Sequence, residues 1–306
     1  MVDESSLKYW HDAGHVARRT LDAMREEITV GKSWDSVIQT AERFIRRNGG
    51  NPAFPVTIAV NELAAHYTTD HGVIAPEGWD KEMEFQNGDL VKLDVGVHIN
   101  GHIGDNALTI EIETNKYAKL IDTSREALNA AIEVAGPGIN VGMIGYAVQT
   151  TIENRGYKPI ANLTGHGIKR YNLHSGISVP NVKENGGTVL KSGDIIAIEP
   201  FVTDGAGRVG GKQNSNIYHM RQIRNIKDEK AAKMIDEIQH RYKGLPFAER
   251  WLHQIQENDA TNSLTKLMRA GIVSYYPVLD ELGKGMVAQS EHTVLITNSG
   301  SEVLTT

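Results

Sequence analysis

An internal duplication constrains the fold of this chain more than any other feature of its 306 residues. When residues 21–49 are shifted by 107 positions, the apolar positions of two successive helical patterns fall on those of a second segment without a gap. Gly31 then coincides with Gly138, and Gly49 coincides with Gly156. A repeat of this kind predicts two structurally similar halves.

The agreement resumes downstream, where residues 88–94 match residues 193–199 at a shift of 105. Each half therefore contains two helical patterns, a loop, a Gly-Asp pair and an apolar strand. The strand ends in a carboxylate, Asp94 in one half and Glu199 in the other. Coincidental amphipathic periodicity is the alternative, but it does not account for the matching glycines and carboxylates. If the halves pack about a pseudo-two-fold axis, Asp94 and Glu199 approach the same point.

Residues 91–109 predict a β-hairpin, because apolar residues fill both arms around Asn-Gly at 100–101, the dipeptide that a type I′ turn prefers. Folding about this turn places Asp105 opposite Gly96. Asp94 and Asp105 then become diagonal neighbours on one face, with Cα atoms about 7–8 Å apart. Their repulsion favours a positive group between them, such as a pair of metal ions about 3.5–4 Å apart. The alternative is that both carboxylates lie on the solvent-exposed face of a sheet. The hairpin alone does not favour either interpretation over the other.

Apolar periodicity predicts two N-terminal helices and three more in an insertion, over residues 7–27, 33–47, 227–242, 246–256 and 263–270. Ser33 is the expected N-cap of the second helix. The insertion occupies residues 225–285 and interrupts the second half. After it, residues 286–304 predict two strands joined by a loop, with Glu291 inside the first strand.

Composition limits the kind of site and the kind of protein. The sequence contains no cysteine, so any metal site must use His, Asp and Glu side chains. The formal net charge of -6 gives no support to a nucleic-acid-binding surface. The first 17 residues resemble neither a signal peptide nor an anchor, and no apolar run reaches the roughly 18 residues of a membrane span. The expected location is the cytoplasm.

Four carboxylates lie in apolar strand contexts: Asp94, Asp105, Glu199 and Glu291. Acidic residues are rarely buried without partners. Because two of the four are matched by the duplication, a shared site is favoured over four surface positions. Oxygen-rich ligation with a single imidazole suits Mn, Fe(II), Co or Zn.

Three histidines have sequence contexts that suit a site. His166 is flanked by glycines, which allow close approach of the backbone. His66 lies in Asn-Glu-Leu-Ala-Ala-His-Tyr, and His174 follows His166 by eight residues. Each of them, taken alone, is more often structural than functional.

The other histidines are expected to lie away from the site. His98 and His102 flank the hairpin turn and are expected to face solvent. His292 should point away from its neighbour Glu291, since successive strand residues face opposite sides. The remaining six carry no context of this kind: His11, His15, His71, His219, His240 and His253.

In this order, the four carboxylates and His166 resemble the five metal ligands of the methionine aminopeptidases, which share the pita-bread fold with prolidases and creatinases. The resemblance covers nearly the whole chain, and its motifs are similar to those of the type 2 branch: Phe54-Pro55, Ala65-His66-Tyr67, Leu93-Asp94-Val95-Gly96, Gly165-His166, Ile198-Glu199-Pro200-Phe201, Leu245-Pro246-Phe247-Ala248 with Arg250-Trp251, and Ala288-Gln289-Ser290-Glu291-His292-Thr293. The helical insertion is also a mark of that branch. The chain lacks a long charged N-terminal extension and so resembles the shorter archaeal form.

The chain departs from the family pattern at two positions of the hairpin. Asn106 stands where a hydroxyl or thiol residue is commoner, and His102 stands where an aromatic or apolar residue is commoner. Both departures bear on the surroundings of the ligands and not on the ligands themselves.

The resemblance implies an α+β pita-bread fold, with two pseudo-symmetric α/β halves around a central antiparallel sheet. Residues 1–224 and 286–306 would form the catalytic domain, and residues 225–285 would form a helical insertion subdomain. The implied activity is removal of the initiator methionine from nascent proteins and peptides, with a small second residue preferred. The implied partners are the N-termini of nascent polypeptides, near the ribosome. No binding to a membrane or to a specific nucleic acid is expected. The enzyme is expected to be a monomer.

The resemblance also implies a division of the ligands between two divalent ions of Co, Mn, Fe(II) or Zn. Asp105 and Glu291 would bridge the two ions. Asp94 would complete one of them, and His166 and Glu199 would complete the other. The ions would lower the pKa of a shared water and polarise the scissile carbonyl.

Further roles follow from the same resemblance. Glu199 would be the general base that takes the proton of the attacking water. His66 and His174 would hydrogen-bond the substrate and the tetrahedral intermediate. Candidates for the apolar pocket that holds the methionine side chain are Phe54, Leu173, Ile217 and Tyr276.

Two other functions compete with this one. A prolidase or aminopeptidase P would share the five ligands, but usually carries further histidines near the ligand histidine and a large separate N-terminal domain. A non-catalytic pita-bread protein that binds RNA or protein typically loses ligands and gains basic segments. This chain keeps all five ligands and is acidic, and it enters the repeat almost at once.

Overall fold

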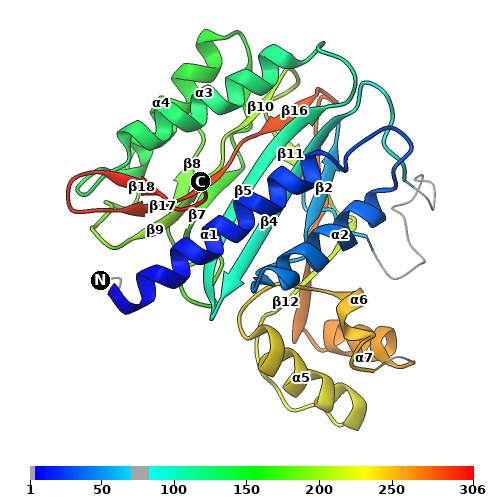
Figure 1. Cartoon of the computed structure of the whole chain (residues 1–306). Helices are drawn as coiled ribbons and strands as arrows, with labels where there is room; N and C mark the ends of the chain where they lie inside the picture. Colours follow the sequence, from blue (N-terminus) through cyan, green and yellow to red (C-terminus); the bar gives the residue numbers. More distant parts are fainter. Residues whose placement is uncertain (1–3, 70–82, 257) are drawn as a thin grey trace.

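The predicted hairpin is formed by β4 (Leu90–Ile99) and β5 (His102–Glu111) in the structure, a computed structural model that describes residues 4–69, 83–256 and 258–306 (Figure 1). Gly96 pairs with Asp105 and Asp94 pairs with Ala107, which is the predicted register. Asn100 and Gly101 have φ values of 51° and 85°, as a type I′ turn requires at both central positions. Asp94 and Asp105 therefore share one face of the hairpin.

The duplication is visible as two helix pairs, one in each half. The first pair is α1 (Glu4–Arg25) and α2 (Trp34–Arg47), and the second is α3 (Ala118–Val134) and α4 (Val141–Asn154). The glycines that coincide in sequence also coincide in conformation: φ is 77° at Gly31 and 83° at Gly138, and it is 84° at both Gly49 and Gly156. This left-handed conformation strongly favours glycine, which explains why the repeat retains these positions.

Side-chain caps begin the second helix of each pair. Ser33 caps α2 and accepts a hydrogen bond from the Ser36 backbone N–H, as predicted. In the second half, Asn140 caps α4 and accepts from the backbone N–H of Gly142. The two helix pairs thus begin their second members by the same device.

Short strands accompany the hairpin in the first half, and in the other half they form a second sheet of five strands together with smaller three-stranded sheets. The first-half strands are β1 (Asn51–Pro52), β2 (Thr57–Val60) and β3 (Leu63–Ala65). The second-half strands before the insertion are β6 (Lys158–Pro159), β7 (Thr164–Ile168), β8 (Ser178–Pro180), β9 (Ile195–Ile198), β10 (Phe201–Thr203) and β11 (Val209–Gly210). Later strands are β15 (Leu279–Glu281), β16 (Val287–Gln289), β17 (His292–Ile296) and β18 (Ser301–Val303). β15 falls within the predicted bounds of the insertion, 225–285, but pairs with β3 and β11.

All strand pairs are antiparallel, and the two halves meet beside β5. β1, β2 and β5 join β4, while the second sheet has the order β18-β17-β9-β7-β8. A single bridge between Ala107 and Glu291 connects β5 to the segment that links β16 and β17. The Thr293 hydroxyl reinforces this junction through hydrogen bonds of 2.8 and 2.9 Å with the backbone N–H and carbonyl of Asp105. The halves therefore meet at the strand that carries Asp105.

Each half has its own apolar core. Leu93, Val95 and Val97 of β4 pack with α1 and α2, whereas Ile196 and Ile198 of β9 pack with α3 and α4. The helices cover one face of each sheet, which leaves the other face of β4 and β5 directed toward the second half (Figure 1). The carboxylates predicted to share a site lie on that inner face.

The insertion has its own apolar cluster and projects from the rest of the chain, in yellow to orange in Figure 1. Its elements are α5 (Glu229–Tyr242), β13 (Phe247–Ala248), α6 (Glu249–Leu252), α7 (Ala260–Arg269) and β14 (Val273–Pro277). The strand β12 (Asn214–Met220) precedes the insertion and pairs with β13 and β14. The helix predicted over 246–256 is wrong in extent, because Phe247 and Ala248 pair with β12 and only the four residues of α6 are α-helical.

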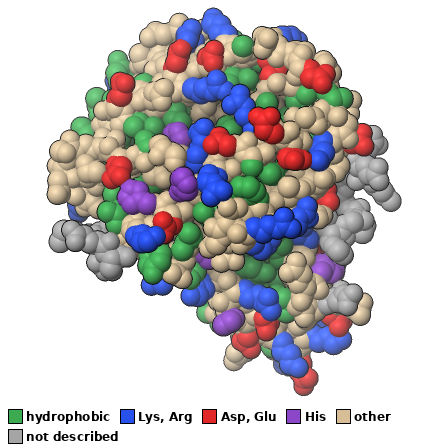
Figure 2. All heavy atoms as spheres, in the orientation of Figure 1, with side chains coloured by type: hydrophobic (Ala, Val, Ile, Leu, Met, Phe, Trp, Pro, Cys, Tyr) green, Lys and Arg blue, Asp and Glu red, His purple; other side chains and the backbone are tan. Residues whose placement is uncertain are grey.

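The face in Figure 2 mixes basic and acidic side chains, over α1 and α2 as well as over the insertion. Within the described ranges, none of the helices is both long enough and apolar enough to cross a membrane.

Candidate metal centre

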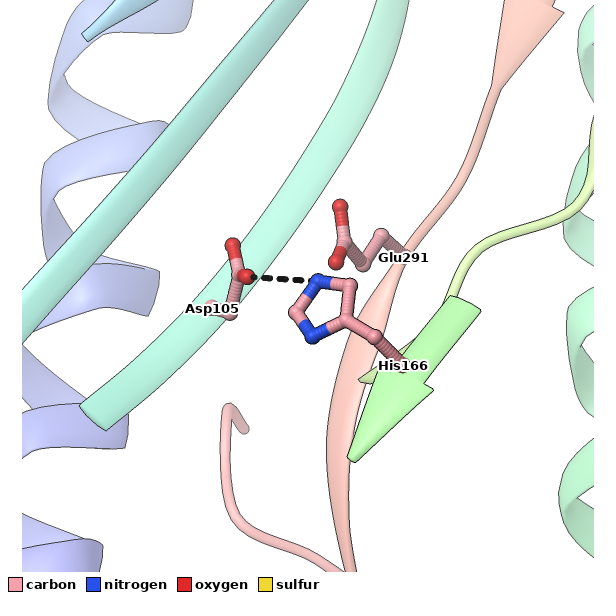
Figure 3. A group of neighbouring side chains, drawn as sticks. All are labelled: Asp105, His166 and Glu291. Carbon is pink, nitrogen blue, oxygen red and sulfur yellow. Dashed lines mark ion pairs between the residues drawn. The ribbon is translucent and has the colours of Figure 1, made fainter. Parts of the chain in front are cut away.

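Three of the predicted ligands converge from different elements of the fold (Figure 3). Asp105 comes from β5, His166 from β7, and Glu291 from the segment between β16 and β17. One potential ligand atom from each of the three lies within 4.8 Å of the others. His166 Nε2 is 3.6 Å from Asp105 Oδ2 and 3.7 Å from Oε1 of Glu199, which follows β9. Asp94 lines the same cavity.

Glu291 reaches this point through an interruption of its strand. The prediction that it lies inside a continuous first strand is wrong, because β16 ends at Gln289 and β17 begins at His292. The backbone N–H of Glu291 instead donates to the carbonyl of Ala107 at 3.0 Å. His292 faces away from the cavity, with Nδ1 at 2.9 Å from Thr305 Oγ1.

Burial dominates the electrostatics of the four carboxyl groups. It raises the pKa of Asp94 to about 7. It also raises the pKa values of Asp105, Glu199 and Glu291 well above the ordinary range, and neighbouring carboxylates raise them further. An apolar site crowded with acidic groups favours their neutral forms unless a cation compensates the charge.

The unpaired atoms of the site fit a divalent cation. Among the described residues, the buried Oδ1 atoms of Asp94 and Asp105 have no hydrogen-bond partner. Burial, and next the charge of His174, lower the pKa of His166 to about 3, so its imidazole is neutral at pH 7 and able to bind a metal. Buried carboxylate oxygens together with a neutral imidazole are a donor set suited to Mn, Fe(II), Co or Zn.

Gln289 and Thr293 support these ligands and were not identified from the sequence. Gln289 Nε2 donates to Glu291 Oε2 at 3.2 Å, and a hydrogen bond from Gln289 also opposes the rise in the pKa of Asp94. Thr293 holds the backbone of Asp105 at the junction of the halves. Both lie in residues 288–293, close to Glu291, and both are buried. Their polar residue types in an apolar segment were the sequence signal that could have identified them.

All six predicted substrate-binding residues line the same cavity as the five predicted ligands. They are Phe54, His66, Leu173, His174, Ile217 and Tyr276. Thr57 and Pro246 also line it and were not predicted as site residues. Thr57 of β2 pairs with Asp94 of β4. The sequence signal for Thr57 was a polar residue in an otherwise apolar strand. Pro246 lies in the Leu-Pro-Phe-Ala motif, and nothing in its residue type indicates a cavity.

Three aromatic rings form one wall of the cavity. Tyr276 lies with its ring centroid 5.4 Å from that of His66 and 6.0 Å from that of His174. The ring of His174 lies 4.4 Å from that of His166. Burial, followed by the charge of His174, lowers the pKa of His66 to about 4, so the His66 imidazole is neutral at pH 7. The wall thus places hydrogen-bonding imidazoles next to the ligands.

The expectation that His98 and His102 face solvent is wrong. Their exposed fractions are 9% and 6%. His102 stacks on Tyr9 of α1 at 5.3 Å, and His98 lies 5.6 Å from the ring of Tyr171. The helix can lie this close because β5 presents Gly104 to Gly14, where an added Cβ would come within 2.5 Å of the helix backbone.

Asn106 does not line the cavity that holds the predicted metal ligands. It pairs with Val95, so it lies on the hairpin face that packs against α1, opposite to the face that carries Asp105.

Four of the histidines without a sequence signal, His11, His15, His240 and His253, lie outside the cavity lining. His71 falls outside the described residues. His219 packs behind the cavity wall, with its ring centroid 4.8 Å from that of Tyr276. This contact could not be predicted from the sequence, because it depends on the pairing of β12 with β14.

Comparison with known proteins gives a consistent result across the chain. The model of metallopeptidase family M24 matches residues 8–298. A methionine aminopeptidase of Methanocaldococcus jannaschii is 41% identical over 294 residues, which are 96% of each chain. One from Archaeoglobus fulgidus is 38% identical over 304 residues, covering 99% of this chain and 100% of the relative. The crystal structure of a methionine aminopeptidase from Thermotoga maritima is 26% identical with a TM-score of 0.69, covering 99% of this chain and 97% of that one. The expected pita-bread fold is confirmed.

Proposed function

The chain belongs to the metallopeptidase family M24, among the methionine aminopeptidases of archaeal type 2 form, and from this premise we propose that it removes initiator methionine from nascent proteins and peptides. Family membership makes it a metal-dependent hydrolase. The observation that carries the proposal is one cavity lined by four carboxyl groups, of which those of Asp105 and Glu291 are buried, and by three imidazoles whose pKa values burial lowers. A small second residue is the preferred substrate feature.

Two divalent ions of Co, Mn, Fe(II) or Zn would be held by the five acidic and imidazole side chains. Asp94, Asp105, His166, Glu199 and Glu291 would together hold the ions. The unpaired buried oxygens of Asp94 and Asp105 support this assignment. When bound, the ions supply Lewis-acid chemistry, lowering the pKa of an attacking water and polarising the scissile carbonyl.

Glu199 is the general base of the proposed reaction. Without a bound cation, burial and next the charge of Asp94 raise the pKa of the Glu199 carboxyl. As one of the residues that would hold the metal, Glu199 would lie within reach of the water whose proton it accepts. It accepts a proton from the attacking water and returns it to the leaving amine. His66 and His174 donate hydrogen bonds to the substrate carbonyl and to the negative charge that develops in the tetrahedral intermediate.

The methionine side chain occupies a slot formed by Phe54, Leu173, Ile217 and Tyr276. Phe54 lies directly on Gly96, where an added Cβ would come within 2.1 Å of the Phe54 ring. Glycine opposite Asp105 thus lets an aromatic side chain approach the ligand face of the hairpin.

The proposed substrates are nascent polypeptides that present a free N-terminus near the ribosome in the cytoplasm. The enzyme would act as a monomer, without a membrane or a specific nucleic acid. Cleavage at the first peptide bond alone requires that the site recognise the free amine, and a metal ion held by the acidic ligands could bind that amine.

Mass spectrometry of a Met-Ala-Ser peptide incubated with the protein and a panel of divalent ions tests the proposal. We expect release of methionine with at least one of Co, Mn, Fe(II) and Zn, and much slower release from Met-Leu-Ser. An intact Met-Ala-Ser peptide with every ion would contradict the activity. Cleavage of Ala-Pro, a dipeptide that ends in proline, in place of Met-Ala-Ser would favour the prolidase alternative.

A further inference from the structure

A buried ion pair joins the helical insertion to the first half. Arg250, on α6 of the insertion, contacts Glu42 of α2 through its Nη2 atom. Their exposed fractions are only 9% and 4%. Glu42 also accepts a hydrogen bond of 2.8 Å from the indole N–H of Trp251. A pair held in this way on both carboxylate oxygens is fixed in orientation as well as in charge.

The same guanidinium group holds the chain that follows His66. Arg250 Nη1 donates to Thr68 Oγ1 at 3.0 Å and to the carbonyl of Thr69 at 2.7 Å. Thr68 is further bound by its hydroxyl to the Val56 carbonyl at 2.8 Å. The two residues that lie two and three positions after His66 are therefore anchored to the insertion.

His66 needs such anchoring because its backbone is strained. Its φ of 65° lies in the left-handed region, which a residue other than glycine seldom adopts. Such a conformation is unfavourable and persists only where the surrounding structure imposes it. On the N-terminal side, Ala65 pairs with Leu279 in the ladder between β3 and β15. On the C-terminal side, the Tyr67 carbonyl accepts from the backbone N–H of Ile58 at 3.0 Å, and the Thr68 N–H donates to the Ser215 carbonyl at 3.2 Å. Arg250 adds the restraint that comes from the insertion.

We propose that the Glu42–Arg250 pair positions His66, so that the insertion takes part in catalysis without contributing a group to the chemistry. Arg250 and Glu42 do not line the cavity, and they act by fixing the backbone from which the His66 imidazole projects. This inference rests on the proposed role of His66 in substrate binding. The competing explanation is that the pair serves only to attach the insertion.

Double-mutant kinetics separate these explanations. We expect Arg250→Met to lower kcat by about 10- to 100-fold, as a small misplacement of a reacting group can. KM and bound metal should change little. In a His66→Ala background the same substitution should have almost no further effect, because the residue it positions is gone. An equal loss of kcat in both backgrounds would overturn the proposal.

A second readout does not depend on turnover. Diethyl pyrocarbonate modifies accessible imidazoles, and the rate at His66 can be followed by mass spectrometry of its peptide in the metal-loaded protein. We expect faster modification in Arg250→Met and, to a smaller extent, in Glu42→Gln, which is the milder variant if Arg250→Met folds poorly. Unchanged modification in both would overturn the positioning role. Unchanged turnover in His66→Ala would instead contradict the proposed function of His66.

Leu264→Ala provides the matched control. Leu264 is buried in the insertion's own apolar cluster, so its truncation weakens the insertion without touching the ion pair. At a temperature where this variant is folded, kcat and His66 modification should equal those of the wild type. A loss of kcat equal to that of Arg250→Met would mean that the pair only attaches the insertion.

Discussion

The Nε2 atom of His166 lies 3.6 Å from Oδ2 of Asp105, although the two residues belong to different halves of the duplication. The hairpin can bring Asp105 only toward Asp94, which lies on the same pair of strands. His166 and Glu199 arrive with the sheet of the second half. The donor set is therefore complete only when the halves have packed, and binding a metal there would favour the packed state.

Replacing Asp105 by Asn removes a negative charge at nearly constant volume. If Asp105 bridges two ions, the variant should lose several orders of magnitude in methionine release, and its metal content should fall. Metal analysis by inductively coupled plasma mass spectrometry and peptide kinetics check this together. Asp122→Asn, on the exposed face of α3, is the control and should behave as the wild type. Near-normal turnover and metal load in Asp105→Asn would show that the centre is misplaced.

His66→Ala should lower kcat by about 10²–10³-fold, the effect of losing one donor to the developing negative charge. Bound metal should be unchanged, since the assigned role of His66 is toward the substrate. The pKa of about 4 means that His66 is already neutral at pH 6, so the activity of the wild type should not fall through its titration near pH 6.5. His15→Ala, at an exposed position of α1, serves as the control. Loss of metal from His66→Ala would make this residue a ligand.

In the metal-free protein, the contribution of Asp94 to the free energy of unfolding should decrease as the pH rises. The pKa of Asp94 is raised in the folded state to about 7 from an ordinary 3.8. Folded protein therefore holds the proton that unfolded protein releases, and the contribution is full below about pH 4 and lost as the pH passes 7. Asp105, Glu199 and Glu291 act in the same direction.

Buried histidines also change the stability of the folded protein with pH, so the contribution of Asp94 must be measured by comparison with a variant that lacks it. Burial lowers the pKa of several, including His166 and His292, so they stabilise the folded state as the pH rises toward 6.5. Urea unfolding of chelated wild type and Asp94→Asn at several pH values cancels their contribution. We expect the wild type to lose stability relative to the variant between pH 4 and pH 7. A constant difference between the two proteins would contradict the raised pKa.

The parts of the site that could be predicted from the sequence are those set by local rules. The turn at residues 100–101 fixes the register that puts Asp94 and Asp105 on one face. The duplication then matches Asp94, in the middle of β4, with Glu199, which directly follows β9. Both inferences use only strand periodicity and positions that require a left-handed backbone. These features depend on the local sequence and not on the segments that pack against it.

The parts that failed depend on packing between distant segments. His98 and His102 are buried because Tyr9 and Tyr171 cover them, and nothing in the hairpin sequence indicates those neighbours. The strand that was expected to contain Glu291 is interrupted because its backbone pairs with Ala107. Hydrogen bonding across the junction of the halves cannot be read from the local pattern of either half.

Asn106 offers a gain in stability. Its side chain is fully buried against α1, and within the described part of the chain neither its amide nitrogen nor its carbonyl oxygen has a hydrogen-bond partner. Each buried polar group without a partner costs roughly 1–3 kcal/mol. Asn106→Val should therefore raise the free energy of unfolding by about 1 kcal/mol or more, with metal content and kcat unchanged. Asn106→Ala should gain less, since it leaves a void. A destabilised Asn106→Val would show that the amide is hydrogen-bonded in solution.

Tyr276→Ala should change the selection of the first substrate residue and should leave the size limit on the second substrate residue unchanged. Tyr276 closes the wall beside His66 and His174, at the point where the insertion returns to the core. An apolar slot distinguishes side chains by about 1–3 kcal/mol per methylene-sized difference, so a wider slot weakens discrimination without abolishing it. KM for Met-Ala peptides should rise, and bulkier first residues should be cleaved relatively faster.

A kinetic series of Met-Ala, Leu-Ala, Phe-Ala and Met-Leu peptides checks the two ends of the substrate separately. Tyr275→Ala is the matched control, because successive residues of β14 face opposite sides and the Tyr275 hydroxyl donates to the Lys212 carbonyl away from the cavity. It should keep the wild-type ranking of first residues. If Tyr276→Ala leaves that ranking intact but accelerates Met-Leu cleavage, Tyr276 faces the second residue and the methionine slot must be formed by other side chains.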